Sequence, residues 1–361
     1  MDFGIFSNGF RKHTIAARTY DEDIHEIALA EELGFSVAYI SEHHGEPPYI
    51  GTVDTIPAPD MLMCKAAAVT KRIRMGAAVK LAHLHHPLDV AMQAAVASHL
   101  VGDGRFIFGF GSGFPSPLFS AERGLTYEDR HERLSESLDF ILKCWTESAP
   151  FDWNGKHWRA KGVVSLPKPH PAPLPMATAT DSEAMLARAA QNGWTLLTAF
   201  LEPAPHVQQK AAKYAAFARA AGRPHGRRNV VGSRIVYVAD SKRQAIDEMR
   251  DAVAYEVSVQ AQRGFLTMLK RLYGLDVPNG PNAIDALAES GFYIVGAPDE
   301  VAAEIARFYQ ACGGFGTFLI VAGKDWATRE HRNRSMRRFM EEVAPQLRHL
   351  DPASESAAAA S

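Results

Sequence analysis

The sequence has few cysteines, no long apolar run and no excess of charge of one sign. Cys64, Cys144 and Cys312 lie far apart and form no CxxC pair, which argues against a zinc site or a redox dithiol. No window approaches about 18 uninterrupted apolar residues, and residues 1–6 do not resemble a secretory signal. A net charge of -2 offers neither a basic field for nucleic acid nor a polybasic membrane anchor. We therefore expect a cytoplasmic protein that binds neither nucleic acid nor membranes.

A dinucleotide-binding fingerprint is also missing. Glycines alternate in Gly109-Phe110-Gly111-Ser112-Gly113, but the spacing is not GxGxxG and no ribose-binding acid follows at the expected distance. Alternating glycines do allow a flat ligand or a phosphate to approach the backbone closely. The chain is therefore not expected to bind NAD(P)H through such a motif.

What the sequence has is a repeated alternation of short β-forming runs and amphipathic helical segments. A run at 2–7 is followed by a helical segment at 20–34, with acids in its first turn and Gly34 just past its end, and by a second run at 37–42. Strand–helix–strand units are nearly always parallel and right-handed, so this unit predicts an α/β fold. Further strands are expected at 73–81, 105–110, 175–179, 195–200, 230–239 and 317–322, with helices between them and a last helix at 327–347. Eight strands in this rhythm predict a (β/α)8 TIM barrel with insertions.

We expect a single domain over residues 1–350 with two insertions. Residues 146–175 break the rhythm with aromatic residues and with a proline at every second position from 167 to 175, which favours an elaborated loop over the barrel mouth. Residues 264–290 show no clear periodicity and are expected to form an irregular second insertion. The small-residue tail at 351–361 is expected to be disordered.

Polar side chains follow two neighbouring strands at the rim where barrels of this kind carry their chemistry. The second strand ends in Glu42, His43 and His44. A general acid or base must sit on a fixed strand end, which favours a catalytic His43, with a histidine that ties down a loop as the alternative. Alternation along the strand points His44 away from His43 and favours a supporting role.

The third strand is followed by three more histidines. For His83 and His85 the sequence leaves site support and packing equally open. His86 precedes Pro87, which favours a role in shaping the turn into the next helix. Further along, Thr180, Asp181 and Ser182 precede a helix, where they can serve as its N-cap, hold a phosphate at the helix start, or do both.

Four segments taken together resemble the bacterial luciferase family of flavin-dependent monooxygenases. They are 2–6, 40–44, 76–79 with the following His86-Pro87, and 104–109, and the match runs in register to about residue 200. The resemblance implies that reduced FMN (FMNH2) binds at the strand C-termini and reacts with O2 to give a C4a-hydroperoxide, which inserts one oxygen atom into a small organic substrate. It also implies a separate NAD(P)H:flavin reductase and a homodimer or higher homo-oligomer.

The resemblance assigns roles to individual residues. The family's catalytic histidine falls on His43. Glu42, His44, His83 and His85 are expected as substrate-side or supporting residues because of their place on the rim. A non-proline cis peptide beneath the flavin ring falls on the bond between Ala78 and Val79, with Ala77 beside it. Cofactor contacts fall on the residues Gly111, Ser112, Asp181, Ser182 and Thr198.

The sequence departs from the family at one of these positions. The luciferase catalytic subunit has Arg and Cys where this chain has Gly111 and Ser112. Without that guanidinium, a flavin phosphate must be held by the backbone, by hydroxyls, or by another cation such as Arg123 or Arg130. We therefore expect a relative of the luciferases and not a luciferase.

Three other functions remain open. The first is a deazaflavin-dependent oxidoreductase of the same barrel. The second is a TIM-barrel metal hydrolase with His83, His85, Glu42 and His43 as ligands, although hydrolases of that type carry the histidine pair after the first strand. The third is a non-catalytic flavin binder, which would have no need of His43. Hydroxylation, Baeyer–Villiger insertion and carbon–heteroatom cleavage all remain possible reactions.

Overall fold

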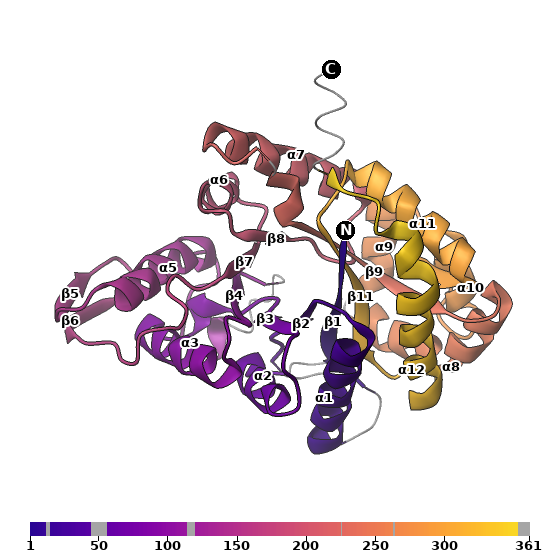
Figure 1. The fold of residues 1–361 in the computed structure, drawn as a ribbon, viewed down its shortest axis with the longest axis horizontal. Coiled ribbons are helices and arrows are strands. Elements are labelled where there is room, and N and C mark those ends of the chain that lie inside the picture. Colours follow the sequence, from indigo (N-terminus) through magenta and orange to yellow (C-terminus); the bar gives the residue numbers. More distant parts are fainter. Residues whose placement is uncertain (12–14, 45–55, 114–119, 225, 263, 353–361) are drawn as a thin grey trace.

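Eight parallel strands close into a barrel in the computed structural model, which describes residues 1–352 except 12–14, 45–55, 114–119, 225 and 263. Around the barrel, β11 pairs with β1 and β8 pairs with β9, which closes the sheet (Figure 1). This confirms the predicted (β/α)8 fold. The barrel strands are β1 (Asp2–Phe10), β2 (Val37–Ile40), β3 (Arg74–Ala77), β4 (Phe106–Gly111), β7 (Met176–Ala179), β8 (Thr195–Leu197), β9 (Val230–Val238) and β11 (Thr317–Lys324).

Helices surround the barrel, and three of them begin at a proline. Proline occupies the first helical turn at Pro59, Pro87 and Pro298, where its missing N–H breaks no helical hydrogen bond. The first helix was predicted to start at Tyr20 but starts at Ala16, so its acids lie beyond its first turn. The flanking helices are α1 (Ala16–Leu33), α2 (Pro59–Ala67), α3 (Pro87–Val101), α5 (Arg130–Thr146), α6 (Glu183–Asn192), α7 (Ala204–Ala220), α8 (Lys242–Ala261), α11 (Pro298–Cys312) and α12 (Arg329–Arg338), which continues through a π-helical turn (Phe339–Val343) into α13 (Ala344–Leu347).

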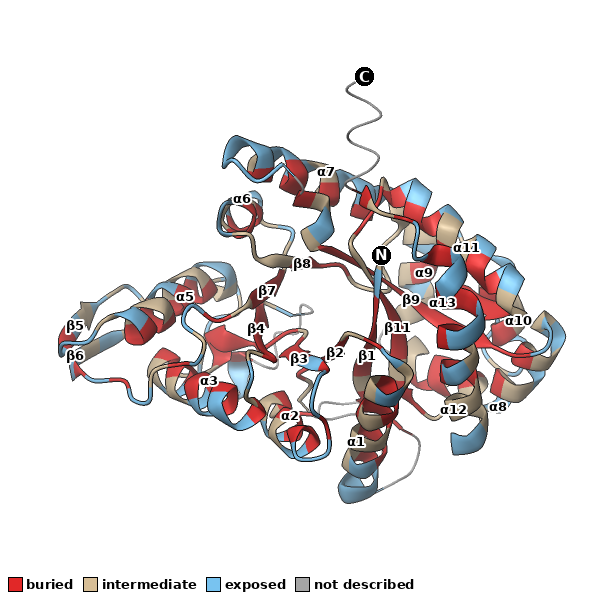
Figure 2. Cartoon of the chain, viewed as in Figure 1, coloured by how far each residue is buried: buried red, intermediate tan, exposed pale blue. Residues whose placement is uncertain are grey.

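The strands are buried on both faces, which explains their nearly continuous apolar runs. All residues of β2 and β9 are buried, as Figure 2 shows in red. Along β2, Val37 and Tyr39 pack in one cluster with residues of the other barrel strands, whereas Ala38 and Ile40 pack in the larger cluster with the helices. A further short strand, β10 (Tyr293–Gly296), pairs with the second half of β9.

The first insertion is a hairpin and does not cover the barrel mouth. Its strands, β5 (Phe151–Asn154) and β6 (Arg159–Val163), lie at the periphery beside α5 (Figure 1). The ring of Trp153 lies 5.1 Å from that of Phe140 on α5, and Trp158 donates to the Ser137 hydroxyl at 2.8 Å. The prediction of a loop over the mouth was therefore wrong, because the aromatic residues of the insertion pack against a helix.

The second insertion is helical, so the prediction of an irregular segment at 264–290 was also wrong. It holds α9 (Phe265–Tyr273) and α10 (Ala283–Glu289), which are too short to show a clear period in sequence. Their buried residues Leu269, Ile284 and Leu287 pack in one cluster with residues of α8.

Near the C-terminus Asp351 pairs with Arg228 at 2.6 Å. The rest of the tail that was expected to be disordered, beyond residue 352, lies outside the described residues.

A buried ion-pair cluster fastens α1 and α12 to the end of β1. Arg11 follows β1 directly and donates to Asp23 at 2.7 Å and to Glu26 at 3.1 Å, both on α1. Arg332 on α12 donates to Glu26 at 3.3 Å. These contacts fix the rim at the C-terminal end of β1.

Within the described part of the chain, no helix combines the length and apolarity needed to cross a membrane.

Candidate active site

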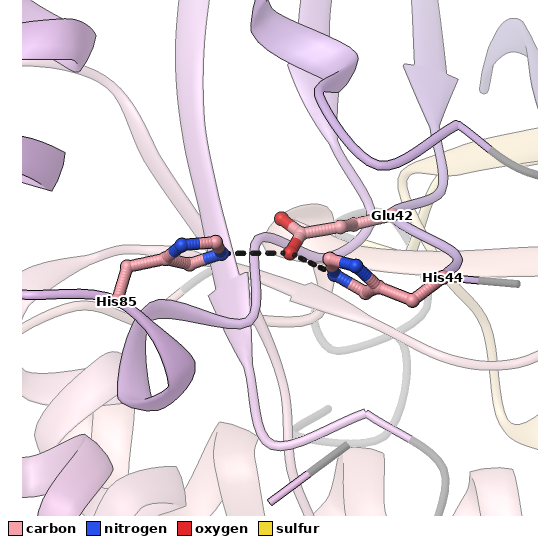
Figure 3. Close-up of side chains that lie close together, drawn as sticks. All are labelled: Glu42, His44 and His85. Carbon is pink, nitrogen blue, oxygen red and sulfur yellow. Dashed lines mark hydrogen bonds and ion pairs between the residues drawn. The ribbon is translucent and has the colours of Figure 1, made fainter. Parts of the chain in front are cut away.

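Glu42 lies at the centre of a polar cluster at the C-terminal ends of β2 and β3. Its Oε1 accepts hydrogen bonds from Nε2 of His44 at 2.9 Å and from Nε2 of His85 at 3.1 Å, and these imidazoles lie on either side of it (Figure 3). Its Oε2 accepts from the Leu81 N–H at 3.2 Å and lies 3.4 Å from Nζ of Lys80. Burial raises the pKa of Glu42, but the bonds from both histidines and the charge of Lys80 outweigh it, so the pKa lies well below its ordinary value. Glu42 is therefore an anion that orients two imidazoles.

His44 connects Glu42 to Arg123, and this contact determines where its proton lies. Nη2 of Arg123 is 3.1 Å from Nδ1 of His44. A guanidinium can only donate, so Nδ1 must accept, and the proton of the neutral ring must be on Nε2, where it is donated to Glu42. His44 is thus held in one tautomer by a partner on each nitrogen.

The same tautomer argues against a metal ion in this cluster. Ligand atoms of Glu42, His44 and His85 lie within 4.8 Å of one another, a spacing that a metal could use. A metal on Nε2 of His44 would leave the proton on Nδ1, where it would face the donor group of Arg123. The cluster is better described as a hydrogen-bonded carboxylate with two histidines.

Lys80 and Asp60 belong to the same cluster and were not singled out from the sequence. Nζ of Lys80 is buried between Glu42 and Asp60 of α2, 3.5 Å from the Asp60 carboxylate. Burial lowers the pKa of Lys80, but the two carboxylates outweigh it and raise the pKa above its ordinary value. Burial also raises the pKa of Asp60. The available signal was a lysine within the otherwise apolar run 77–82 at a strand end.

His43 is anchored at the rim through its main chain. Its N–H donates to the carbonyl of Ile56 at 3.1 Å, and the residue is half-buried. It directly follows Glu42, so the position expected of a catalytic histidine lies beside the cluster. The imidazoles with described hydrogen bonds to the Glu42 carboxylate are those of His44 and His85.

The histidines after β3 occupy three different environments. His83 lies in a short 3-10 helix, η1 (Ala82–Leu84), and is 3% exposed, whereas His85 joins Glu42. His86 is the N-cap of α3, where its Nδ1 accepts from the Leu88 N–H at 3.2 Å, as predicted for a turn-shaping residue. The helix η1 ends at Leu84, and the backbone of His85 is extended (φ −120°, ψ 157°), so the chain changes direction between the two histidines. This separates His83 from His85.

His83 is expected to make the protein less stable in mild acid. Its burial, and then the positive charge of Arg133, lower its pKa to about 3, so the folded protein keeps it neutral between pH 3 and 6.5 while the unfolded chain protonates it. Stability from this residue is fully present above the unfolded pKa and is lost as pH falls, by about 2 kcal/mol between pH 7 and 5. Urea unfolding of wild type and His83→Phe at both pH values measures it. Equal losses in the two proteins would contradict the assignment.

The expected flavin face consists of small residues at the ends of β3 and β4. The peptide bond between Ala78 and Val79 is cis, which confirms that prediction. Ala77 is buried and Ala78 is half-buried. A Cβ on Gly111 would lie 2.7 Å from the Val79 side chain, so this glycine is required for strand packing, a reason distinct from ligand approach. Ser112 follows it and is half-buried.

The side chains expected to contact the flavin phosphate and ring already bind other groups of the protein. Ser182 is the N-cap of α6, as predicted, with its Oγ accepting from the Met185 N–H. The Asp181 carboxylate is exposed and pairs with Lys210 at 2.7 Å, so only its main chain suits an anion at the helix start. The Thr198 hydroxyl donates to the Val231 carbonyl at 2.7 Å inside the barrel.

Arg123 and Arg130, the two cations suggested as substitutes for the missing arginine, also contact other residues of the protein. Arg123 contacts His44 and lies 3.3 Å from Glu122. The Arg130 guanidinium lies over the Tyr127 ring, 4.1 Å from its centroid, and donates to the Tyr127 carbonyl at 3.4 Å. The described contacts of both guanidinium groups are to protein atoms, so these contacts assign neither of them to the flavin phosphate.

Comparisons with known proteins show which family this barrel belongs to. The chain is 31% identical over 336 residues to 4-hydroxyprotoasukamycin monooxygenase of Streptomyces nodosus subsp. asukaensis, covering 89% of this chain and 86% of that protein. The fold is similar to that of the monooxygenase RslO1 of Streptomyces bottropensis (TM-score 0.78, 25% identity, 96% and 99% of the chains). It is also similar to the oxygenating constituent of 3,6-diketocamphane monooxygenase of Pseudomonas putida, solved in complex with FMN (TM-score 0.80, 23% identity, 96% and 98% of the chains). The model of the luciferase-like monooxygenase family matches residues 1–314, and the chain therefore belongs to that family.

Proposed function

We propose that this chain is the oxygenase component of a two-component monooxygenase that takes FMNH2 from a separate NAD(P)H:flavin reductase and inserts one atom of O2 into a small organic substrate. Two relatives support the arrangement by their names: the P. putida protein is an oxygenating constituent with FMN, and a trigonelline monooxygenase of Acinetobacter baylyi is an oxygenase component. The absence of a GxGxxG fingerprint in the sequence agrees with electrons arriving on a flavin reduced elsewhere.

The residues at the rim fit a flavin. Ala77 and Ala78 have small side chains that suit a flat ring beside the ends of β3 and β4, and the hydroxyls of Ser112 and Ser182 with the start of α6 suit a phosphate. When bound, reduced FMN would supply the electrons that activate O2. The rest of the chemistry is positioning, proton transfer and exclusion of water.

The protein's own part in that chemistry centres on the strand end of β2. We assign His43 the role of acid or base, because its main chain is fixed on both sides, by Glu42 and by the bond to Ile56. Glu42 accepts a hydrogen bond from each of His44 and His85, and His44 carries its proton on Nε2. Glu42 thereby fixes the orientation of both imidazoles at the rim. The Glu42-centred cluster at the carboxyl ends of β2 and β3 is the observation that carries the proposal.

Flavin binding and product mass test the proposal. Purified protein is titrated with FMN and, separately, with a deazaflavin cofactor, and then mixed with FMNH2, O2 and a panel of apolar and ring-bearing substrates. We expect FMN binding and a product heavier than its substrate by one oxygen atom, labelled when 18O2 is used. Binding of the deazaflavin without FMN, or a substrate oxidised without gain of oxygen, would identify a dehydrogenase of the same barrel instead.

A further inference from the structure

Two strongly buried side chains near the Glu42 cluster each carry a nitrogen atom without a described hydrogen-bond partner. Nη1 of Arg133 and Nδ1 of His83 have no partner within the described structure, and both residues are 3% exposed. The hydroxyl of Tyr127 is a third buried atom without a partner. Each unpaired buried group costs free energy, and a ligand that accepts hydrogen bonds could satisfy those that lie on neighbouring elements.

Arg133 is a buried cation with an incomplete set of acceptors. It lies in the first turn of α5, and its Nη2 donates to the Thr126 carbonyl at 2.6 Å. Among the described residues no carboxylate lies within ion-pair distance of its guanidinium, unlike the buried Arg11, which has two on α1. Burial lowers the pKa of Arg133, and the nearby Asp129 only partly offsets this. A buried guanidinium of this kind is costly unless an anion completes its hydrogen bonds.

His83 lies across the contact between η1 and α5, which pack against each other. Among the charged groups around His83, which include Glu42, His85 and His131, Arg133 has the largest effect on its pKa. Because His83 stays neutral, its unpaired nitrogen can donate one hydrogen bond without adding a second positive charge. The pair therefore offers a cationic and a neutral donor, both shielded from water and both beside the rim.

We propose that Arg133 and His83 form a binding site for one oxyanion group of a ligand of this enzyme. A phosphate or a carboxylate has two oxygen atoms that can accept from Nη1 of Arg133 and from His83. The group can come from the FMN phosphate or from an acidic organic substrate, and both present the same chemistry. Only this choice of ligand rests on the proposed function, because the unpaired donors are a property of the fold.

Binding to the apoprotein distinguishes the sources without any turnover. Wild type, Arg133→Met and His83→Phe are titrated with FMN, riboflavin, inorganic phosphate and benzoate by calorimetry. If the phosphate of FMN is the ligand, wild type binds FMN at least about tenfold more tightly than riboflavin, and Arg133→Met removes that preference. If an organic acid is the ligand, Arg133→Met leaves the ratio of the FMN and riboflavin affinities unchanged, and it weakens benzoate binding at least about tenfold, with a several-fold weakening in His83→Phe.

Controls separate binding from structure. Lys143→Met removes the same charge from the far end of α5, where Lys143 lies over the Phe151 ring, and should leave every affinity unchanged. Without ligand, Arg133→Met should melt no lower than wild type, since it removes an unpaired buried charge. The site is refuted if the affinities for FMN, phosphate and benzoate are the same in Arg133→Met as in wild type. Absence of oxygenation in every assay would refute the proposed function but leave this binding result standing.

Discussion

Replacing His43 by alanine is expected to lower the rate of product formation by roughly 10²–10⁴-fold, the usual contribution of a positioned acid or base. Its main chain is held by the Ile56 carbonyl, so the side chain starts from a fixed point at the rim. FMN affinity should change little, because the substitution removes a proton-transfer group and leaves the β3 and β4 ends intact. Single-turnover reactions started with FMNH2 and followed by mass spectrometry of the product measure the effect.

A histidine away from the rim provides the matched control for this prediction. His99 is exposed in the last turn of α3, where its ring contacts the Lys168 carbonyl at 2.8 Å. His99→Ala should form product at the wild-type rate. If His43→Ala does so too, His43 is not the acid or base, and His44 or His85 becomes the next residue to replace.

Replacing Glu42 by alanine is expected to lower the free energy of unfolding by about 3–5 kcal/mol, the cost of breaking a buried ion pair. The change removes the acceptor of His44, His85 and the Leu81 N–H, and it leaves buried Lys80 with Asp60 as its remaining described carboxylate. Glu42→Gln keeps an acceptor oxygen but loses the charge, so a smaller loss of about 1.5–3 kcal/mol is expected. Urea unfolding at pH 7, where Glu42 is ionised, measures both.

The control for Glu42 is an exposed glutamate. Glu132 pairs with Lys156 at 2.6 Å on the surface, where water screens the pair, so Glu132→Ala should change stability little. Wild-type stability in Glu42→Ala would show that the cluster does not hold the rim together. Because Glu42 also fixes the tautomer of His44, the variant should in addition form product more slowly than wild type.

Much of the fold could be predicted from the sequence because burial in a (β/α)8 barrel is periodic. Runs such as 230–239 are apolar since both faces of β9 are buried, and Pro87 marks the start of α3 by local chemistry alone. The segments that were predicted wrongly have weak local signals. The helices α9 and α10 are short, and the place of the β5–β6 hairpin depends on contacts of Trp153 and Trp158 with α5, a helix of a different segment.

The sequence by itself determined that the chain is a barrel and that Glu42, His43 and His44 lie on the rim at the C-terminal end of β2, because a strand end is a local feature. The tertiary structure decided the partners. Glu42 contacts His85, which is 43 residues further along the chain, and His44 contacts Arg123, which is 79 residues further along. The periodic patterns of helices and strands do not predict contacts at such separations. Likewise, that Lys80 is a counterion, and that Arg133 is the charge with the largest effect on His83, follows from how β2, β3, η1 and α5 pack. Packing of distant segments brings these charges together, so only the folded chain shows which histidine is held by which acid.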